Sequence, residues 1–188
     1  APLPPRSPHR AWGQTTRPPE RSQGWLGPPL ASRTCSPTSL GMALALQGCK
    51  ATTLEVARGV YDKGGDLYGN WSFNVAYAGS RGLRAVARHL TGWRAVEDEI
   101  AAGRAVVISH RYKKGQLEGG AVSATVGHLI VLVGFTETGD VVVHDPAGNT
   151  RQGRPIRRVY KRDQLWNTWQ RNHEGVAYLV QPDELVAK

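Results

Sequence analysis

Residues 33–48 read RTCSPTSLGMALALQG: a cysteine, then a proline, then an apolar run that ends at a glycine. Pro37 suits the first turn of a helix, where its missing N–H is not needed, and apolar side chains recur on one helical face. Gly48 is typical of a helix end. The pattern predicts a helix over residues 37–47 with Cys35 at its N-terminus. There, unpaired N–H groups and partial positive charge lower the pKa of a thiol.

Cys35 has two interpretations at this stage, an ordinary packing residue or a nucleophile. The second cysteine, Cys49, lies at the far end of the predicted helix, on the order of 20 Å away at a rise of about 1.5 Å per residue. A disulfide needs Cα atoms within about 7 Å. The two cysteines are therefore expected to stay unpaired, with Cys49 buried.

The rest of the chain predicts helices first and antiparallel strands afterwards, which makes the fold α+β. A hairpin turn at residues 138–140 is expected to join two β-branched strands. Helices are expected over 52–61, 70–79, 93–102 and 163–169, and strands over 105–109, 127–135, 141–145 and 176–180.

The chain length of 188 residues suits one domain with a sizeable core. Residues 1–21 are rich in Pro and Arg and are expected to form an extended, disordered leader, with the domain over 22–188. The Ala-Pro start without a methionine is what signal cleavage leaves, so we expect a secreted protein. No apolar run is long enough to predict a membrane span.

Lys and Arg outnumber Asp and Glu by 24 to 15, a net charge of +9. This balance favours either attraction to an acidic surface, such as an anionic cell-surface polymer, or simply higher solubility. The run over residues 151–162 concentrates the basic side chains, and a solvated face is the default interpretation. No motif indicates specific nucleic-acid binding, and no His, Cys and carboxylate spacing indicates a metal site.

A reactive thiol needs an imidazole base, which in turn needs an orienting group. Of six histidines, His128 heads the apolar strand GHLIVLVGF, and the hairpin brings Asp145 from the paired strand to the same open end. His144 precedes Asp145 and should point to the opposite face. Cys35, His128 and Asp145 are thus candidates for nucleophile, base and orienter. Singly, each of these residues also has an ordinary structural interpretation.

Acyl transfer also needs hydrogen-bond donors for the developing oxyanion. The Cys35 N–H supplies one donor, and the side-chain amide of Gln23 is the candidate for the second. Gln14 and Gln47 are less well placed, one in the leader and one a helix length away from the sulfur.

These segments resemble the thirty-ninth family of cysteine peptidases, papain-fold enzymes of the bacteriocin-leader-processing type, and in particular its stand-alone exported bacterial branch. The resemblance reaches from about residue 22 to 180, and CSP stands where exporter-linked members more often have Cys-Gly. It implies a papain-like fold, with Cys35 as nucleophile, His128 as general base and acid, Asp145 as orienter and Gln23 as oxyanion donor. The matching segments are Ser22-Gln23, CSPTSL at 35–40, YGNWSFNVAYAG at 68–79, VVIS at 106–109, GHLIVLVGF at 127–135 and VVVHDPAG at 141–148.

Together these features predict a secreted, monomeric cysteine peptidase or amide hydrolase that needs no cofactor and acts on a peptide or protein substrate. Two alternatives stay open. In one, an amine replaces water and the same triad performs acyl transfer. In the other, the chain is a non-catalytic papain-fold module that binds an acidic polymer.

Overall fold

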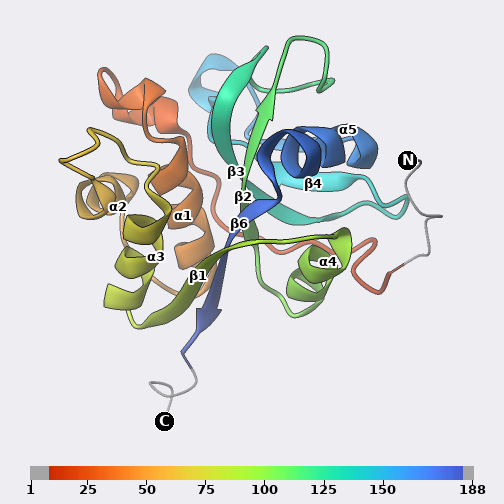
Figure 1. The fold of residues 1–188 in the computed structure, drawn as a ribbon, viewed down its shortest axis with the longest axis horizontal. Coiled ribbons are helices and arrows are strands. Elements are labelled where there is room, and N and C mark those ends of the chain that lie inside the picture. The colour runs from red at the N-terminus through yellow and green to blue at the C-terminus, as the bar shows by residue number, and fades with distance from the viewer. Residues whose placement is uncertain (1–8, 184–188) are drawn as a thin grey trace.

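The computed structural model describes residues 9–183 (Figure 1). Two of its α-helices begin at a side-chain cap: Thr52 and Glu55 form a reciprocal capping box at the start of the second helix, and the Asn70 side chain caps the third. The helices are α1 (Cys35–Leu46), α2 (Thr53–Val60), α3 (Trp71–Ser80), α4 (Trp93–Ala101) and α5 (Arg162–Trp166), which continues as one π-helical segment, Asn167–Arg171.

The strands pair antiparallel into one sheet in the order β1-β6-β2-β3-β4-β5. They are β1 (Leu83–His89), β2 (Val106–Tyr112), β3 (Thr125–Phe135), β4 (Val141–His144), β5 (Arg157–Tyr160) and β6 (Val176–Pro182). The predicted α+β fold, with N-terminal helices packed on an antiparallel sheet, is confirmed.

Each face of the sheet carries its own apolar core. Helices α1, α2 and α3 cover one face (Figure 1), where Leu40, Leu44 and Val56 are fully buried against strand residues such as Val131. On the other face, α4 and α5 contribute Ile100 and Leu165 to a second cluster. Because both faces are covered, β3 is a run of apolar residues and does not alternate with polar ones.

The predicted hairpin joins β3 to β4, with Phe135 opposite Val141. The register brings His144 opposite Val131, and Asp145 follows directly after β4. The open end of this hairpin is therefore where the two candidate polar residues of the strands meet.

Two strands were not predicted. In β1, residues 83–89 alternate between half-buried and exposed, but they are mostly Ala and Arg, which have weak strand preference. In β5, Arg157–Tyr160 lies within the basic run that was interpreted as a solvated face, and the strand nevertheless ends in the fully buried Tyr160.

The predicted leader is described from residue 9, and residues 1–8 lie outside the described residues. The described part is extended and is bonded to the sheet: Trp12 and Thr15 form isolated bridges with Phe135 and Gly134, and Ala11 is fully buried. This part of the leader is therefore packed rather than free. Among residues 9–183, no helix is both long and apolar enough to cross a lipid bilayer.

Candidate active site

Cys35 is the first residue of α1, and its side chain is half-buried. The preceding Thr34 does not cap the helix, because its hydroxyl donates to the Leu30 carbonyl instead. The N–H groups at the start of α1 are thus not taken up by a capping side chain, which leaves them available to negative charge at the sulfur.

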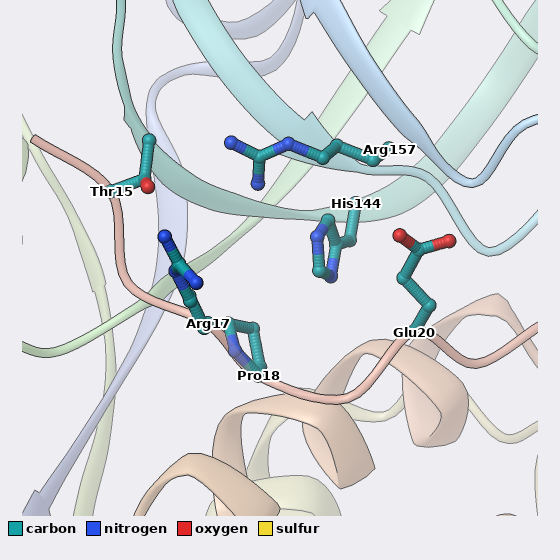
Figure 2. Close-up of a pocket in the computed structure, with 6 residues that line it drawn as sticks. All are labelled: Thr15, Arg17, Pro18, Glu20, His144 and Arg157. Atoms are coloured by element: carbon teal, nitrogen blue, oxygen red, sulfur yellow. The ribbon is translucent and has the colours of Figure 1, made fainter. Parts of the chain in front are cut away.

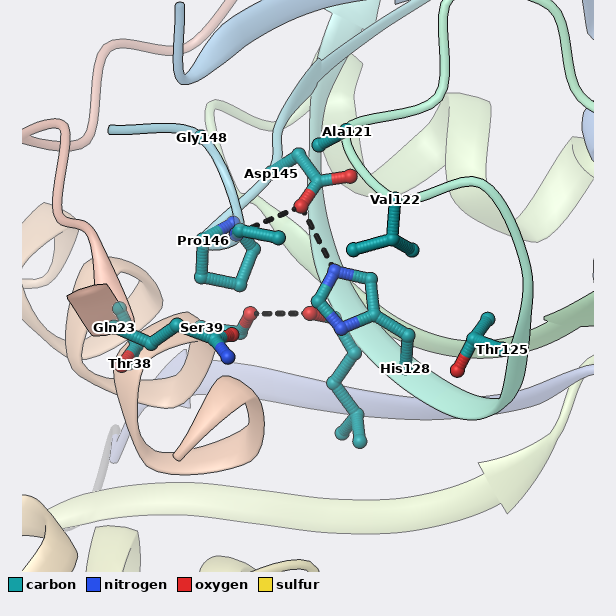
Figure 3. A network of polar contacts seen from close by, with 12 residues as sticks. Gln23, Thr38, Ser39, Ala121, Val122, Thr125, His128, Asp145, Pro146 and Gly148 are labelled. Atoms are coloured by element: carbon teal, nitrogen blue, oxygen red, sulfur yellow. Dashed lines mark hydrogen bonds and ion pairs between the residues drawn. The ribbon is translucent and has the colours of Figure 1, made fainter. Parts of the chain in front are cut away.

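His128 and Asp145 form a buried ion pair, with 2.8 Å between His128 Nε2 and Asp145 Oδ1 (Figure 3). His128 is 5% exposed and Asp145 is fully buried. Because Asp145 occupies Nε2, the other ring nitrogen, Nδ1, is the one free to interact with the Cys35 thiol. The structure therefore brings Cys35, His128 and Asp145 into one constellation.

The Asp145 carboxylate is held by three donors. Oδ1 also accepts from the Ala147 N–H at 2.9 Å, and Oδ2 accepts from the hydroxyl of Tyr160 at 2.7 Å. Tyr160 is fully buried at the end of β5, and its oxygen accepts in turn from the Ala121 N–H. The sequence analysis missed Tyr160, whose only signal was an aromatic residue inside a basic run.

These contacts set the charges of the site. Burial alone would raise the pKa of Asp145, but His128 and Tyr160 lower it to about 2. Burial alone would lower the pKa of His128, but Asp145, helped by Cys35, raises it to about 10. Burial also opposes the thiolate, yet hydrogen bonding and charge from His128 lower the pKa of Cys35 below its ordinary value. The favoured state is a thiolate–imidazolium pair beside an ionised carboxylate.

Gln23 approaches the same region from the segment before α1. Its backbone N–H donates to the Pro146 carbonyl, one residue after Asp145, and its Nε2 donates to the Ala31 carbonyl at 2.7 Å. One hydrogen of this side-chain amide is thus engaged, and the second has no acceptor within residues 9–183. Figure 3 draws the Gln23 side chain with Thr38 of α1 and with His128.

α1 is fixed to the sheet beside the site by polar contacts as well as apolar ones. The Ser39 hydroxyl donates to the Leu129 carbonyl of β3 at 3.0 Å (Figure 3), and the Ser36 hydroxyl lies 3.2 Å from the Tyr178 hydroxyl of β6. The first of these contacts holds the helix bearing the thiol against β3, the strand that bears the imidazole.

Two other buried histidines lie close to the site. His110 is opposite His128 in the β2–β3 register, with 5.7 Å between the ring centroids. His144 lines a separate pocket with residues of the N-terminal segment (Figure 2), as expected from its position before Asp145. Within the described residues, no group of three or more His, Cys, Asp or Glu side chains is placed to hold a metal ion.

Both cysteines are free thiols. Cys49 is half-buried, whereas burial was expected, because it follows the end of α1 where the chain turns away at the surface. It therefore has to be removed before alkylation can report on Cys35 alone.

A cysteine at a helix N-terminus, facing a histidine and a carboxylate on an antiparallel sheet, defines the papain-like class of cysteine peptidases. The Peptidase C39-like family model matches residues 14–176. The chain belongs to this family. The comparison with curated proteins finds no match.

Solved structures share the fold at low sequence identity. A protein from Bacillus anthracis, described as a C39-like peptidase, is 18% identical to this chain, and its structure gives a TM-score of 0.64 over 91% of this chain and 98% of that one. A double glycine motif protease from an AMS/PCAT transporter, solved with its leader peptide, is 16% identical, with a TM-score of 0.60 over 90% and 95%. The peptidase domain of Streptococcus ComA is 14% identical, with a TM-score of 0.55 over 81% and 93%.

Proposed function

We propose that the protein is a cysteine peptidase that cleaves a peptide bond through a Cys35 thiolate. The observation that carries the proposal is the 2.8 Å bond between His128 and Asp145 at the N-terminus of the helix that begins with Cys35. Family membership supports the same reaction class. Gln23 takes the role of oxyanion donor together with the Cys35 N–H.

In the first half-reaction, the Cys35 thiolate attacks the substrate carbonyl carbon, and negative charge moves to its oxygen. The carbonyl re-forms as the C–N bond breaks, and His128 Nδ1 gives its proton to the leaving amine. The product is a thioester on Cys35. In the second half-reaction, His128 takes a proton from water, the hydroxide attacks the thioester, and the thiolate is restored as the carboxylic acid leaves.

The activation of Cys35 is tested by alkylation in a Cys49→Ser background, where Cys35 is the only thiol. Iodoacetamide should modify it faster than an ordinary thiol at the same pH, because His128 lowers the pKa of Cys35 and raises the thiolate fraction. His128→Ala should slow the reaction sharply. The control is His89→Ala, which removes an exposed imidazole on β1. Slow labelling that is indifferent to His128 would contradict a catalytic thiol and favour the binding-module alternative.

The reaction itself is tested with a diverse peptide mixture in ¹⁸O-labelled water. New peptide ends that carry one ¹⁸O, absent with Cys35→Ser, identify hydrolysis. Products joined to an added amine would identify the acyl-transfer alternative instead. The cleavage sites found by mass spectrometry would define the substrate. Secretion and the monomeric state are separate predictions that this experiment does not address.

A further inference from the structure

A second pocket lies beside β4 and β5, apart from the cysteine site. It encloses about 430 Å³ between these two strands and the extended N-terminal segment, and Figure 2 shows its walls. It shares no residue with the Cys35 constellation, because His144 and Asp145 point to opposite faces of the chain. The lining residues are Thr15, Arg17, Pro18, Glu20, His144 and Arg157.

His144 lines this pocket, and one of its ring nitrogens has no hydrogen-bond partner within residues 9–183. The residue is 3% exposed, and its buried Nδ1 makes no hydrogen bond within the described residues. A buried polar atom without a partner is costly, and native proteins rarely leave one unsatisfied. Because Nδ1 has almost no accessible surface, a ligand atom in the pocket would satisfy it after a rotation of the ring that lines the pocket.

The charges around His144 are mostly positive. Arg17 and Arg157 both reach the pocket, and neither forms an ion pair in the part of the chain described. Glu20 supplies the one carboxylate of the lining (Figure 2). Burial and, after it, the charge of Arg157 lower the pKa of His144 to about 4, so the imidazole is neutral at neutral pH.

We propose that this pocket binds a small phosphate monoester. The guanidinium groups of Arg17 and Arg157 would donate to the phosphoryl oxygens from two sides, with the His144 imidazole beneath. A phosphoryl group offers three oxygens to donors that converge from several directions, whereas one guanidinium satisfies a carboxylate. The pocket is larger than a phosphate ion, and Glu20 would accept from a hydroxyl of the organic part.

The test follows the His144 ring signal by NMR during titration of the full chain with inorganic phosphate, with sulfate and with glycerol 3-phosphate. His144→Gln assigns the signal. We expect saturable shifts, with glycerol 3-phosphate binding most tightly. If inorganic phosphate binds more tightly than glycerol 3-phosphate, the ligand is the free ion, which would contradict a monoester site. If none of the three anions gives a saturable shift, the pocket is not an anion site and the proposal is overturned.

Substitutions separate a built site from general attraction to a basic protein. Arg17→Gln and Arg157→Gln should each weaken binding about tenfold or more, since each removes a charge-assisted contact. Arg88→Gln is the matched control, because Arg88 is an exposed arginine on β1, at the opposite edge of the sheet. Equal weakening by all three variants would overturn the proposal. Both pocket arginines are exposed, so their variants should keep the fold, which the unfolding midpoint checks.

A pH series adds a readout that is independent of affinity. Sulfate stays a dianion throughout, so only protein groups titrate: Glu20 and His144, in the presence of Arg17 and Arg157. Bound sulfate should raise the pKa of His144, because it offsets the positive charge nearby. An unchanged titration of His144 under saturating sulfate would contradict direct contact.

Discussion

His110 and His128 face each other across β2 and β3, yet their environments drive them to opposite charge states. Both are at least nine-tenths buried, and their rings lie 5.7 Å apart. Burial, followed by repulsion from His128, lowers the pKa of His110 to about 3. His128 has its pKa raised to about 10, although burial acts on it in the same direction.

The difference lies in the partner of each ring. Asp145 and Tyr160 extend a chain of charged and neutral hydrogen bonds away from His128. His110 has only the Thr168 hydroxyl, 3.4 Å from its Nδ1, and its Nε2 has no partner in the described part of the chain. Burial favours the neutral form of an imidazole. A carboxylate fixed beside the ring raises its pKa, so that the ring can carry a proton and serve as general acid and base.

Asp145→Asn should have the largest effect, because it removes the feature that distinguishes the two histidines. The asparagine keeps the shape but not the charge, so the pKa of His128 falls and that of Cys35 rises. We expect kcat/KM to fall about 10³- to 10⁴-fold. Peptide hydrolysis measures the loss, and the pH profile of Cys35 alkylation should move to higher pH. An alkylation profile that does not move would show that Asp145 is not the group that charges His128.

Tyr160→Phe should have an intermediate effect, since it removes one donor to Asp145 and keeps the ring. Without this donor the carboxylate is more basic and stabilises the imidazolium of His128 more strongly, so the alkaline limb of kcat against pH should move to higher pH, while activity falls because the carboxylate is less firmly positioned. We expect about tenfold lower activity and about 1–3 kcal/mol lower stability. The pH profile and denaturant unfolding measure the two effects.

Tyr112→Phe is the matched control for Tyr160. It also removes a buried hydroxyl, but one that donates to the Val122 carbonyl and not to the carboxylate. It should lower stability without moving the pH profile. If both variants move the profile equally, Tyr160 has no specific positioning role.

His110→Phe should have the smallest effect on activity, within about threefold, because His110 is neutral at working pH. Its effect should appear in acid. The unfolded chain binds a proton on this histidine below about pH 6.5 and the folded chain does not until about pH 3, so His110 lowers stability as pH falls through that window. The unfolding midpoint of His110→Phe should therefore fall less between pH 6.5 and 4 than that of the parent chain.

Asp145 adds an acid dependence of its own, which the same experiment separates. Its pKa of about 2 lies below its usual value near 4, so its stabilisation is present above about pH 4 and is lost as pH falls toward 2. His110→Phe should leave the slope of the curve below about pH 3 unchanged. A slope that differs from that of the parent chain only below about pH 3 would contradict the assignment to His110.

Local patterns were sufficient to place Cys35 and the β3–β4 hairpin. Helix-start chemistry, a continuous apolar strand and a turn signal each act over a few residues, so they can be read along the chain. The pairing of His128 with Asp145 followed from the geometry of that one hairpin.

Contacts that depend on the register between strands far apart in the sequence could not be predicted from such local patterns. Tyr160 reaches Asp145 only because β5 pairs with β4, and His110 lies beside His128 only because β2 pairs with β3 in one register. β1 was missed for a related reason. Its Ala and Arg residues have weak strand preference, and they form a strand because β6 pairs with them and α3 packs against them.

The division of the site between α1 and the hairpin has a consequence for how the chain matures. Cys35 lies in the N-terminal half of the chain, while His128 in β3 and Asp145, which follows β4, lie in the C-terminal half. Until those halves dock, no imidazolium stands beside the sulfur, and Cys35 keeps the reactivity of an ordinary thiol. Contacts so distant in sequence form slowly. Cys35 is therefore expected to become strongly nucleophilic only when folding is nearly complete, and under the proposed function a partly folded copy would not cleave other chains.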